Sequence, residues 1–279
     1  MKQLSREILP QVIRQRPEDS HKGTYGRVVL IGGNSQYGGA IIMSAQAAVA
    51  SGAGLTTVIT EEKNHAPLHA RLPEAMVINW YDLELVKTAL DTADVVLIGP
   101  GLGLENHSRK LLRFVLRNQL ENQWVIIDGS AITLLADMAV SLNHPEQIIL
   151  TPHQKEWERI SGLPLAKQTD ENNQLTQQKL QASIVVKSHR TRIYTSHNSY
   201  LNTIGTPAMA TGGMGDTLAG IIASFIAQFD AKEHALCAAV YLHSLIGEEL
   251  GKDSYVVLPT SISTHLSSYM KRYEQTSEK

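Results

Sequence analysis

The feature that most constrains the fold of this chain is the alternation of short, β-branched apolar runs with longer windows of helical spacing. The runs are not interrupted by the polar residues typical of half-exposed strands, which indicates strands buried on both faces. Strands alternating with helices predict βαβ units and a mostly parallel central sheet with helices on both faces. The predicted strands cover residues 27–31, 55–60, 94–98, 124–128 and 147–150, and the predicted helices cover 40–51, 106–118 and 154–160.

A different pattern follows in the second half of the chain. Three short strand-like runs separated by polar turns predict an antiparallel meander at one edge of the sheet. Two long helices are expected at 214–228 and 231–250, and the polar stretch 166–178 predicts a solvated helix. Because no repeat or linker interrupts the chain, we expect a single domain over residues 1–279. The three runs of the meander are 184–187, 192–195 and 199–203.

Composition excludes several functional classes. Lys and Arg number 25 against 27 Asp and Glu, a net charge of −2, so a basic nucleic-acid surface is not expected. Cys237 is the one cysteine and cannot form an internal disulfide, which fits a reducing compartment. The most apolar stretch, 40–59, is interrupted by polar residues, and the N-terminus lacks the apolar core of a secretory signal. We therefore expect a cytoplasmic protein without a membrane or nucleic-acid partner.

The run from Asn202 to Asp216 carries the most chemical information. It contains Gly212, Gly213 and Gly215 directly before a predicted helix. Glycines let the backbone approach a ligand closely, and the first amides of a helix have no partner within the helix. Because the helix dipole also favours negative charge there, the loop is a candidate phosphate site.

Asp216 lies in the first turn of that predicted helix, beside the free amides. A carboxylate in this position can orient a hydroxyl group and accept its proton while the oxygen attacks a phosphorus atom. The alternative interpretation is that Asp216 only complements the helix dipole. Spacing alone does not decide between the two, because glycine-rich turns before helices are common.

Two further glycine-rich loops follow predicted strands. Gly99-Pro-Gly-Leu-Gly103 comes after the strand 94–98, and Gly103 is placed to bring amides to an anion or a flat ring. The run 32–39 has glycines at both ends but neither a Walker A sequence nor the GxGxxG spacing. Either loop is also explained as a tight strand-to-helix turn.

Polar residues follow three other predicted strands. His153, in Leu150-Thr-Pro-His153, is placed to hydrogen-bond a substrate, although a histidine satisfied within its own loop is the alternative. Lys187 and Arg190 are placed to meet phosphates, unless they belong to a solvated turn. Asp128 is placed to hold water or Mg²⁺. Together with the three glycine loops, these residues predict a site for a phosphorylated substrate or a nucleotide.

The run Pro207-Ala-Met-Ala-Thr-Gly-Gly-Met-Gly-Asp216 closely resembles the signature of the ADP/ATP-dependent NAD(P)H-hydrate dehydratases, a family of the ribokinase-like superfamily. Supporting matches lie in order along the chain: Lys22-Gly-Thr-Tyr-Gly, Gly32-Gly33, Gly39-Ala40, Gly99 to Gly103, Asp128, and Leu150 to His153 with Glu156. The resemblance implies a three-layer α/β/α ribokinase-like fold with a mostly parallel sheet and an antiparallel edge.

The same resemblance implies an activity and a site. The family removes water from NADHX and NADPHX, the hydrated forms of NADH and NADPH, with Mg²⁺ and with ADP (or ATP) as co-substrate; the products are NAD(P)H, AMP and phosphate. Asp216 is implied as the catalytic base. Ala40, Gly103, His153 and Asp216 are implied contacts of the hydrated dinucleotide, and Lys187, Ser188, His189, Arg190, Thr191 and Gly215 are implied contacts of the nucleotide.

This chain departs from the family pattern at three positions. Ser130 replaces a usual second acid after Asp128, and Gln154-Lys155 replace the usual Pro-Gly after His153. The resemblance also implies a homotetramer. A fused epimerase domain is not expected, because only about 20 residues precede the first core strand, so a separate NAD(P)H-hydrate epimerase is the expected functional partner.

Two other functions remain compatible with these residues. One is a small-molecule kinase of the same fold, of the hydroxymethylpyrimidine or thiazole kinase type, which would release a stable phosphorylated product. The other is a regulatory module that binds a nucleotide without turnover and would have no need of Asp216.

Overall fold

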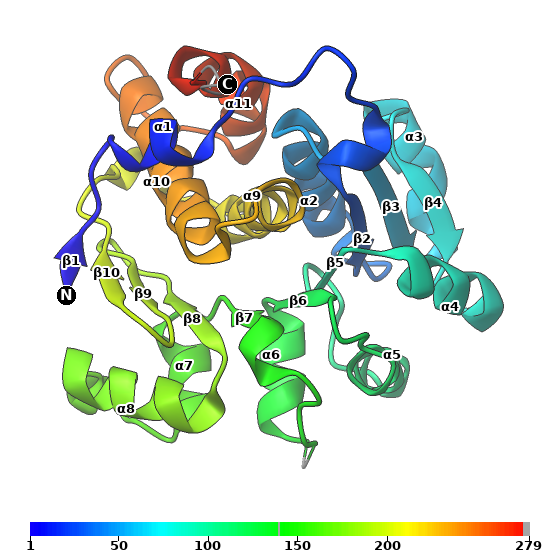
Figure 1. Cartoon of the computed structure of the whole chain (residues 1–279). Helices are drawn as coiled ribbons and strands as arrows, with labels where there is room; N and C mark the ends of the chain where they lie inside the picture. The colour runs from blue at the N-terminus through cyan, green and yellow to red at the C-terminus, as the bar shows by residue number, and fades with distance from the viewer. Residues whose placement is uncertain (139, 276–279) are drawn as a thin grey trace.

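The apolar runs of the sequence form one ten-stranded sheet in the computed structural model, which describes residues 1–138 and 140–275. Within this part of the chain the sheet lies between two layers of helices (Figure 1). The strands are β1 (Lys2–Gln3), β2 (Arg27–Ile31), β3 (Leu55–Thr60), β4 (Met76–Asn79), β5 (Val95–Ile98), β6 (Trp124–Ile127), β7 (Ile148–Leu150), β8 (Ser183–Val186), β9 (Arg192–Tyr194) and β10 (Ser199–Leu201).

The helices alternate with the strands up to β8, and after β10 the last helices follow one another along the chain. The short 3-10 helices are η1 (Lys22–Tyr25), η2 (Glu62–Asn64), η3 (Pro145–Gln147), η4 (Leu165–Lys167) and η5 (Pro207–Met209). The α-helices are α1 (Ile8–Val12), α2 (Gly38–Ala50), α3 (His65–Arg71), α4 (Leu83–Thr92), α5 (Asn106–Arg117), α6 (Ser130–Ala136), α7 (Gln154–Ser161), α8 (Asp170–Leu180), α9 (Met214–Gln228), α10 (Lys232–Gly251) and α11 (Pro259–Tyr273).

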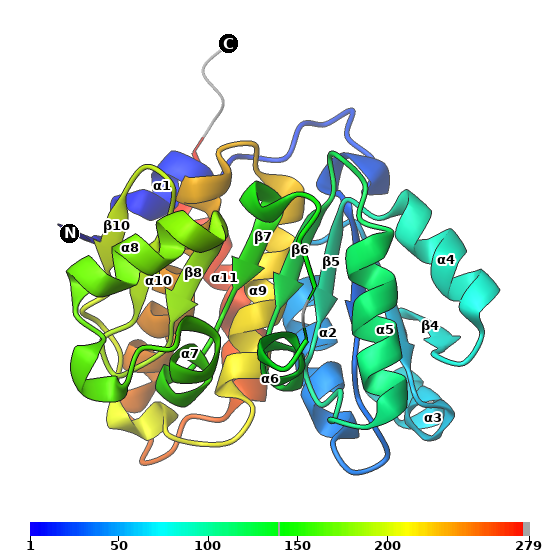
Figure 2. The same cartoon turned by 90° about the horizontal axis from the view of Figure 1, so that it is seen from below.

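The strands lie in the order β1-β10-β9-β8-β7-β6-β5-β2-β3-β4. Neighbours from β8 to β4 are parallel, whereas β9 is antiparallel to both β8 and β10. The predicted α/β/α layers, the mostly parallel sheet and the antiparallel meander are therefore confirmed (Figure 2). The sequence patterns do not predict the edge strands, because β1 has two residues and β4 is only partly buried.

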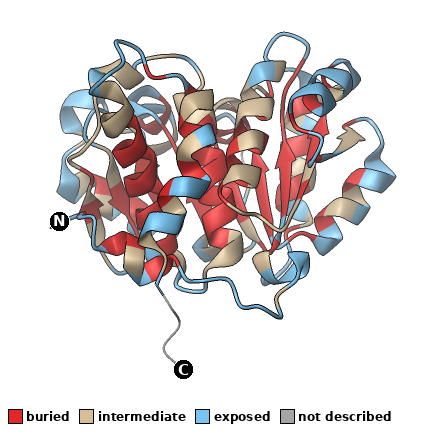
Figure 3. Cartoon of the chain, turned by 90° about the horizontal axis from the view of Figure 1, so that it is seen from above, coloured by how far each residue is buried: buried red, intermediate tan, exposed pale blue. Residues whose placement is uncertain are grey.

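Alternate residues of each parallel strand supply the two hydrophobic cores. Val28 and Leu30 pack in the core beneath α1, α2, α9, α10 and α11, whereas Val29 and Ile31 pack in the core beneath α4 to α7. The interior of the sheet is accordingly buried on both faces (Figure 3). This explains why the strands read as continuous apolar runs.

The polar stretch 166–178 is helical from Asp170 onward, but the prediction that it is solvated is wrong for one of its faces. Asn173 is buried, accepts a hydrogen bond of 2.7 Å from Nε1 of Trp157 and donates one of 3.0 Å to the hydroxyl of Tyr194. Polar side chains can therefore face the core here because each of them has a partner.

Helices α2 and α9 pack against each other at very short range. A Cβ atom on Gly220 of α9 would lie 2.1 Å from the backbone oxygen of Ser44 in α2, so only glycine allows this approach. The Ser44 hydroxyl also donates a hydrogen bond of 2.8 Å to the backbone oxygen of Asp216. These contacts fix the first turn of α9 relative to α2.

Across residues 1–138 and 140–275, no helix combines the length and the apolar character needed to cross a membrane.

Candidate active site

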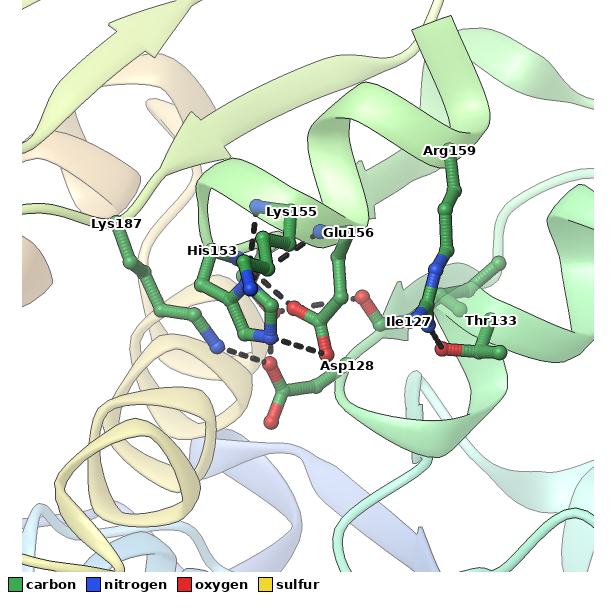
Figure 4. Close-up of polar contacts among 9 residues, drawn as sticks. Ile127, Asp128, Thr133, His153, Lys155, Glu156, Arg159 and Lys187 are labelled. Carbon is green, nitrogen blue, oxygen red and sulfur yellow. Dashed lines mark hydrogen bonds and ion pairs between the residues drawn. The ribbon is translucent and has the colours of Figure 1, made fainter. Parts of the chain in front are cut away.

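Three adjacent strands deliver polar side chains to one edge of the sheet. Asp128 follows β6, His153 lies just beyond β7, and Lys187 follows β8. A β-bridge pairs His153 with Lys187, whose N–H donates to the backbone oxygen of Pro152 at 2.8 Å. Figure 4 shows the side chains of Asp128, Glu156, His153 and Lys187 pointing toward one another. The sheet order thus brings together residues that are far apart in the sequence.

Lys187 and Asp128 form a buried ion pair. Nζ of Lys187 lies 2.6 Å from Oδ1 of Asp128, which also accepts a hydrogen bond of 2.6 Å from the Thr151 hydroxyl. The Lys187 side chain is 19% exposed and that of Asp128 only 2%. Burial opposes the charge on Lys187, but the carboxylate of Asp128 outweighs it and raises the pKa of the lysine. Lys187 is therefore a fixed cation in the site.

His153 is the N-cap of α7. Its Nδ1 accepts hydrogen bonds from the amides of Lys155 and Glu156, so the ring proton is on Nε2, which lies 3.5 Å from Oε1 of Glu156. Oε2 of Glu156 accepts a hydrogen bond of 2.8 Å from the His153 amide and completes a capping box. Burial and the charge of Lys187 lower the pKa of His153, so it is neutral at pH 7.

Asp216 is the third residue of α9, as the glycine-rich loop predicts. Gly213 takes the N-cap position with a φ of 97°, a left-handed conformation that favours glycine. Burial, together with the negative charges of Asp128 and Glu156, raises the pKa of Asp216 to about 6, although Lys187 opposes this shift. The Asp216 carboxylate is therefore electrostatically coupled to the residues at the ends of β6 and β8.

A cavity of about 570 Å³ opens beside the start of α9. Five residues predicted to bind a nucleotide, 187–191, line it together with Gly215. Nζ of Lys187 would lie 3.2 Å from a Cβ atom on Gly215, so a side chain at Gly215 would crowd the cation. The lining residues that sequence reasoning missed are Ile204, Gly205, Thr206, Pro207, Met209, Ala210, Met214, Leu218, Val240, His243 and Ser244.

Some of these missed residues could have been predicted from the sequence. Pro207, Met209 and Ala210 belong to the run that carries the family resemblance, so that run extends to one wall of the cavity. Val240, His243 and Ser244 lie in the middle of the apolar helix α10 and share no motif. Only the packing of α10 against α9 brings them to the cavity.

The four residues predicted to contact the hydrated dinucleotide do not line this cavity: Ala40, Gly103, His153 and Asp216. Ala40 is in the first turn of α2, and its Cβ atom would lie 3.1 Å from a Cβ atom on Gly101. Gly103 has a φ of 81° and lies close to the side chains of Asn34 and Glu105. The glycine loops after β2 and β5 are joined, because the Asn34 amide donates to the Gly101 oxygen at 2.7 Å.

The departures from the family pattern occur at helix starts. Ser130 is the first residue of α6, and Gln154 and Lys155 are the first residues of α7, so all three allow normal helix starts. Within residues 1–138 and 140–275, no group of three or more His, Cys, Asp or Glu side chains is arranged to hold a metal ion.

A larger cavity, of about 880 Å³, lies away from these residues, at the opposite edge of the sheet. It is lined by the N-terminal segment 11–17, by the ends of α2 and α9, and by α11. None of the predicted site residues borders it. We therefore assign the chemistry to the smaller cavity, which is lined by Lys187, the partner of Asp128.

Comparison with known proteins matches most of the chain to one family. A sequence model of the family described as NAD(P)H-hydrate dehydratase matches residues 28–268. The ADP-dependent (S)-NAD(P)H-hydrate dehydratase of Enterococcus faecalis is 58% identical over 275 residues, covering 99% of this chain and 94% of the relative.

Solved structures also resemble this chain over nearly its whole length. A ribokinase-like superfamily protein from Enterococcus faecalis superposes with a TM-score of 0.97 at 57% identity, over 98% of this chain and 96% of that chain. The ADP/ATP-dependent NAD(P)H-hydrate dehydratase of Bacillus subtilis, co-crystallised with ATP and Mg²⁺, has a TM-score of 0.86 at 30% identity, over 98% and 99% of the two chains.

Proposed function

Because this chain belongs to the NAD(P)H-hydrate dehydratase family, we propose that it repairs hydrated NADH and NADPH by ADP-dependent dehydration. It is an enzyme of the hydro-lyase type that forms NAD(P)H, AMP and phosphate from (S)-NAD(P)H hydrate and ADP. The observation that carries this proposal is the position of Asp216, in the first turn of α9 beside Gly215 and the buried cation Lys187.

The chemistry follows from the nature of the leaving group. Hydroxide leaves a carbon atom poorly, whereas a phosphate ester leaves well. Asp216 accepts the proton of the C6 hydroxyl group. The oxygen of that hydroxyl group attacks the β-phosphorus of ADP, and AMP departs. The lone pair of the ring nitrogen then expels phosphate from C6, and loss of a proton from C5 restores the double bond. The nucleotide thus supplies the driving force, and the protein supplies the base and the alignment.

The nucleotide side of the site is formed by residues 187–191 and Gly215 in our proposal. These residues line the cavity of about 570 Å³, which has room for an adenine nucleotide. Lys187 and the free amides at the start of α9 stabilise the charge on the transferring phosphoryl group. Because Asp128 already fixes Lys187, this cation needs little reorganisation when the nucleotide binds.

The hydrated dinucleotide lies on the opposite side of Asp216, against Ala40, Gly103 and His153. The positive φ of Gly103 turns the backbone of the loop after β5, and the absence of a side chain leaves room for the side chains of Asn34 and Glu105. Nε2–H of His153 is a donor that can be shared between Glu156 and a substrate oxygen. In this proposal, the C6 hydroxyl and the β-phosphate of ADP meet beside Asp216.

Mg²⁺ fits this site as an ion held mainly by phosphate oxygens and water, since the described side chains form no protein cage for it. The negative charges of Asp128 and Glu156 both raise the pKa of Asp216, a repulsion that a divalent cation would relieve. Asp128 and Glu156 are the carboxylates that would hold the ion. Bound there, Mg²⁺ would neutralise charge on the transferring group.

The proposal also covers the compartment, the partner enzyme and the assembly of this protein. Buried Cys237 is a free thiol, which is compatible with a reducing cytoplasm. The (R) form of the hydrate requires a separate NAD(P)H-hydrate epimerase before it can react.

We also propose a single domain that assembles as a homotetramer, supported by the exposed apolar side chains of Tyr255, Val256 and Leu258 in one loop. Light scattering on the purified protein measures this assembly.

An absorbance assay at the NADH band tests the activity, with hydrated NADH, ADP or ATP, and Mg²⁺. We expect NADH to appear together with equal amounts of AMP and phosphate. A stable phosphorylated product without NADH would identify a small-molecule kinase instead. Nucleotide binding without any consumption would identify a regulatory module.

A further inference from the structure

Three aromatic rings form a cluster beside the glycine loops, and no step of the proposed reaction uses them. The Tyr81 ring centroid lies 4.3 Å from that of His107, and the Trp80 centroid lies 5.2 Å from His107 and 6.0 Å from Tyr81. Trp80 is only 4% exposed, whereas Tyr81 is 63% exposed. One large aromatic surface is therefore open to solvent, while Trp80 is buried and His107 is partly buried.

The exposed ring is held firmly from below. The Tyr81 ring packs on the His107 ring, which packs in turn on the Trp80 ring. The Tyr81 amide donates a hydrogen bond of 3.0 Å to the Asn79 side chain, and its backbone oxygen accepts one of 3.1 Å from the Leu83 amide at the start of α4. A ligand that stacks on Tyr81 therefore pays little conformational entropy to order it.

The cluster lies at the same edge of the sheet as the glycine loops. Trp80 directly follows the end of β4, and its amide donates to the Thr60 oxygen at 3.1 Å, while the Thr60 hydroxyl donates to the Gly33 oxygen at 2.9 Å. His107 lies in the first turn of α5, four residues after Gly103. Three strand spacings separate β4 from β5, roughly 14 Å in all. The cluster is thus within reach of an extended ligand bound at Gly103.

We propose that the exposed face of Tyr81 stacks on the adenine of the hydrated dinucleotide, while the hydrated nicotinamide end reacts at Asp216. This inference rests on the proposed function, which requires a substrate with two bases joined by a pyrophosphate. Aromatic side chains bind bases by stacking. Lys110 lies one turn beyond His107 on α5 and provides a cation for the phosphates between the two bases. Tyr81 is thus a specificity residue for the dinucleotide rather than a catalytic one.

The test compares Tyr81→Ala with Tyr81→Phe on two substrates, hydrated NADH and the hydrated mononucleotide NMNH, which lacks the adenosine half. For hydrated NADH we expect Tyr81→Ala to raise KM roughly five- to hundredfold, the range that stacking on one base supports, with kcat little changed. Tyr81→Phe retains the ring and should behave like the wild type. The KM of ADP should stay unchanged, and hydrated NMNH should react equally well with all three proteins.

Leu83→Ala is the matched control, because Leu83 is a neighbouring exposed side chain outside the cluster. The inference is overturned if Tyr81→Ala leaves the KM of hydrated NADH within twofold of the wild-type value. It is also overturned if KM rises equally for hydrated NMNH, because the effect would then not involve the adenine. Equilibrium binding of NADH to the same variants decides the matter even if the wild type shows no dehydration, an outcome that would refute the proposed function alone.

Discussion

Nζ of Lys187 lies 2.6 Å from Oδ1 of Asp128, and its charge also acts on Asp216 at the start of α9. One buried lysine therefore interacts electrostatically with two carboxylates from different layers of the fold: Asp128 follows a strand and Asp216 lies in a helix. The pairing of the lysine with Asp128 is structural, and its charge opposes the rise in the pKa of Asp216 that burial causes. The two roles can be separated by substitution.

Lys187→Met should destabilise the fold by about 3–5 kcal/mol, because it leaves the carboxylate of Asp128 buried without a partner. Adding Asp128→Asn to this variant should restore part of the loss, since the uncompensated charge is then removed. Urea unfolding of the two variants measures the difference. Lys179→Met, on the exposed face of α8, is the matched control and should change stability little. Equal stabilities for Lys187→Met and Lys179→Met would contradict the structural role of the pair.

Asp216→Asn should reduce the rate of NADH formation by about 10²–10⁴-fold, the usual contribution of a general base. The amide retains the shape of the side chain but cannot accept the proton. Stopped assays of NADH and AMP measure the loss, and circular dichroism checks the fold. Asp253→Asn, in an exposed position outside the site, should keep full activity. Near wild-type turnover by Asp216→Asn would show that another group is the base.

The pKa of Asp216, about 6, predicts the pH dependence of the reaction. Below this value the carboxyl is protonated and cannot act as a base, so kcat/KM should fall as the pH is lowered through 6 and level off above it. Lys187 opposes the rise in the pKa, so removing its charge should move the midpoint to higher pH. Steady-state rates measured between about pH 5 and 8 cover this transition. A midpoint unchanged in Lys187→Met would contradict the coupling.

The same shift has a consequence for stability. The pKa of Asp216 is higher in the folded protein than the ordinary value of 3.8, so ionisation costs the fold stability as the pH rises from about 4 through 6. Asp216→Asn should therefore stabilise the protein at pH 7, by an amount on the order of 1–3 kcal/mol. At pH values below 3.8 the advantage should vanish. Thermal unfolding at two pH values checks both statements, and a destabilised variant at pH 7 would refute the assigned environment.

Gly220→Ala should destabilise the protein by about 1–3 kcal/mol, because the new methyl group collides with the Ser44 backbone 2.1 Å away. Activity should fall as well, since α9 carries Asp216. Gly39→Ala, at a helical glycine of α2 with open space around it, is the control and should be neutral or stabilising. Differential scanning calorimetry of both variants tests the close approach of the helices.

The sequence predicts the interior of this fold better than its edges. The central parallel strands are continuous apolar runs, and α9 begins and ends where its spacing indicates. Strand β4 escapes prediction because edge strands are only partly buried, and α11 because its apolar positions are sparse between polar residues. In the candidate site, Asp128, His153 and Lys187 can each be predicted from the sequence, because each lies at the end of a predicted strand. Their meeting depends on the order of β6, β7 and β8, which no local pattern encodes.

The contact of Gly220 with Ser44 also bears on how the enzyme reaches its reactive geometry. Helix α2, which begins beside Ala40, and helix α9, which begins beside Asp216, are locked together as a single body. Folding itself consequently sets the position of the proposed base relative to Ala40, the proposed substrate contact, before any ligand arrives.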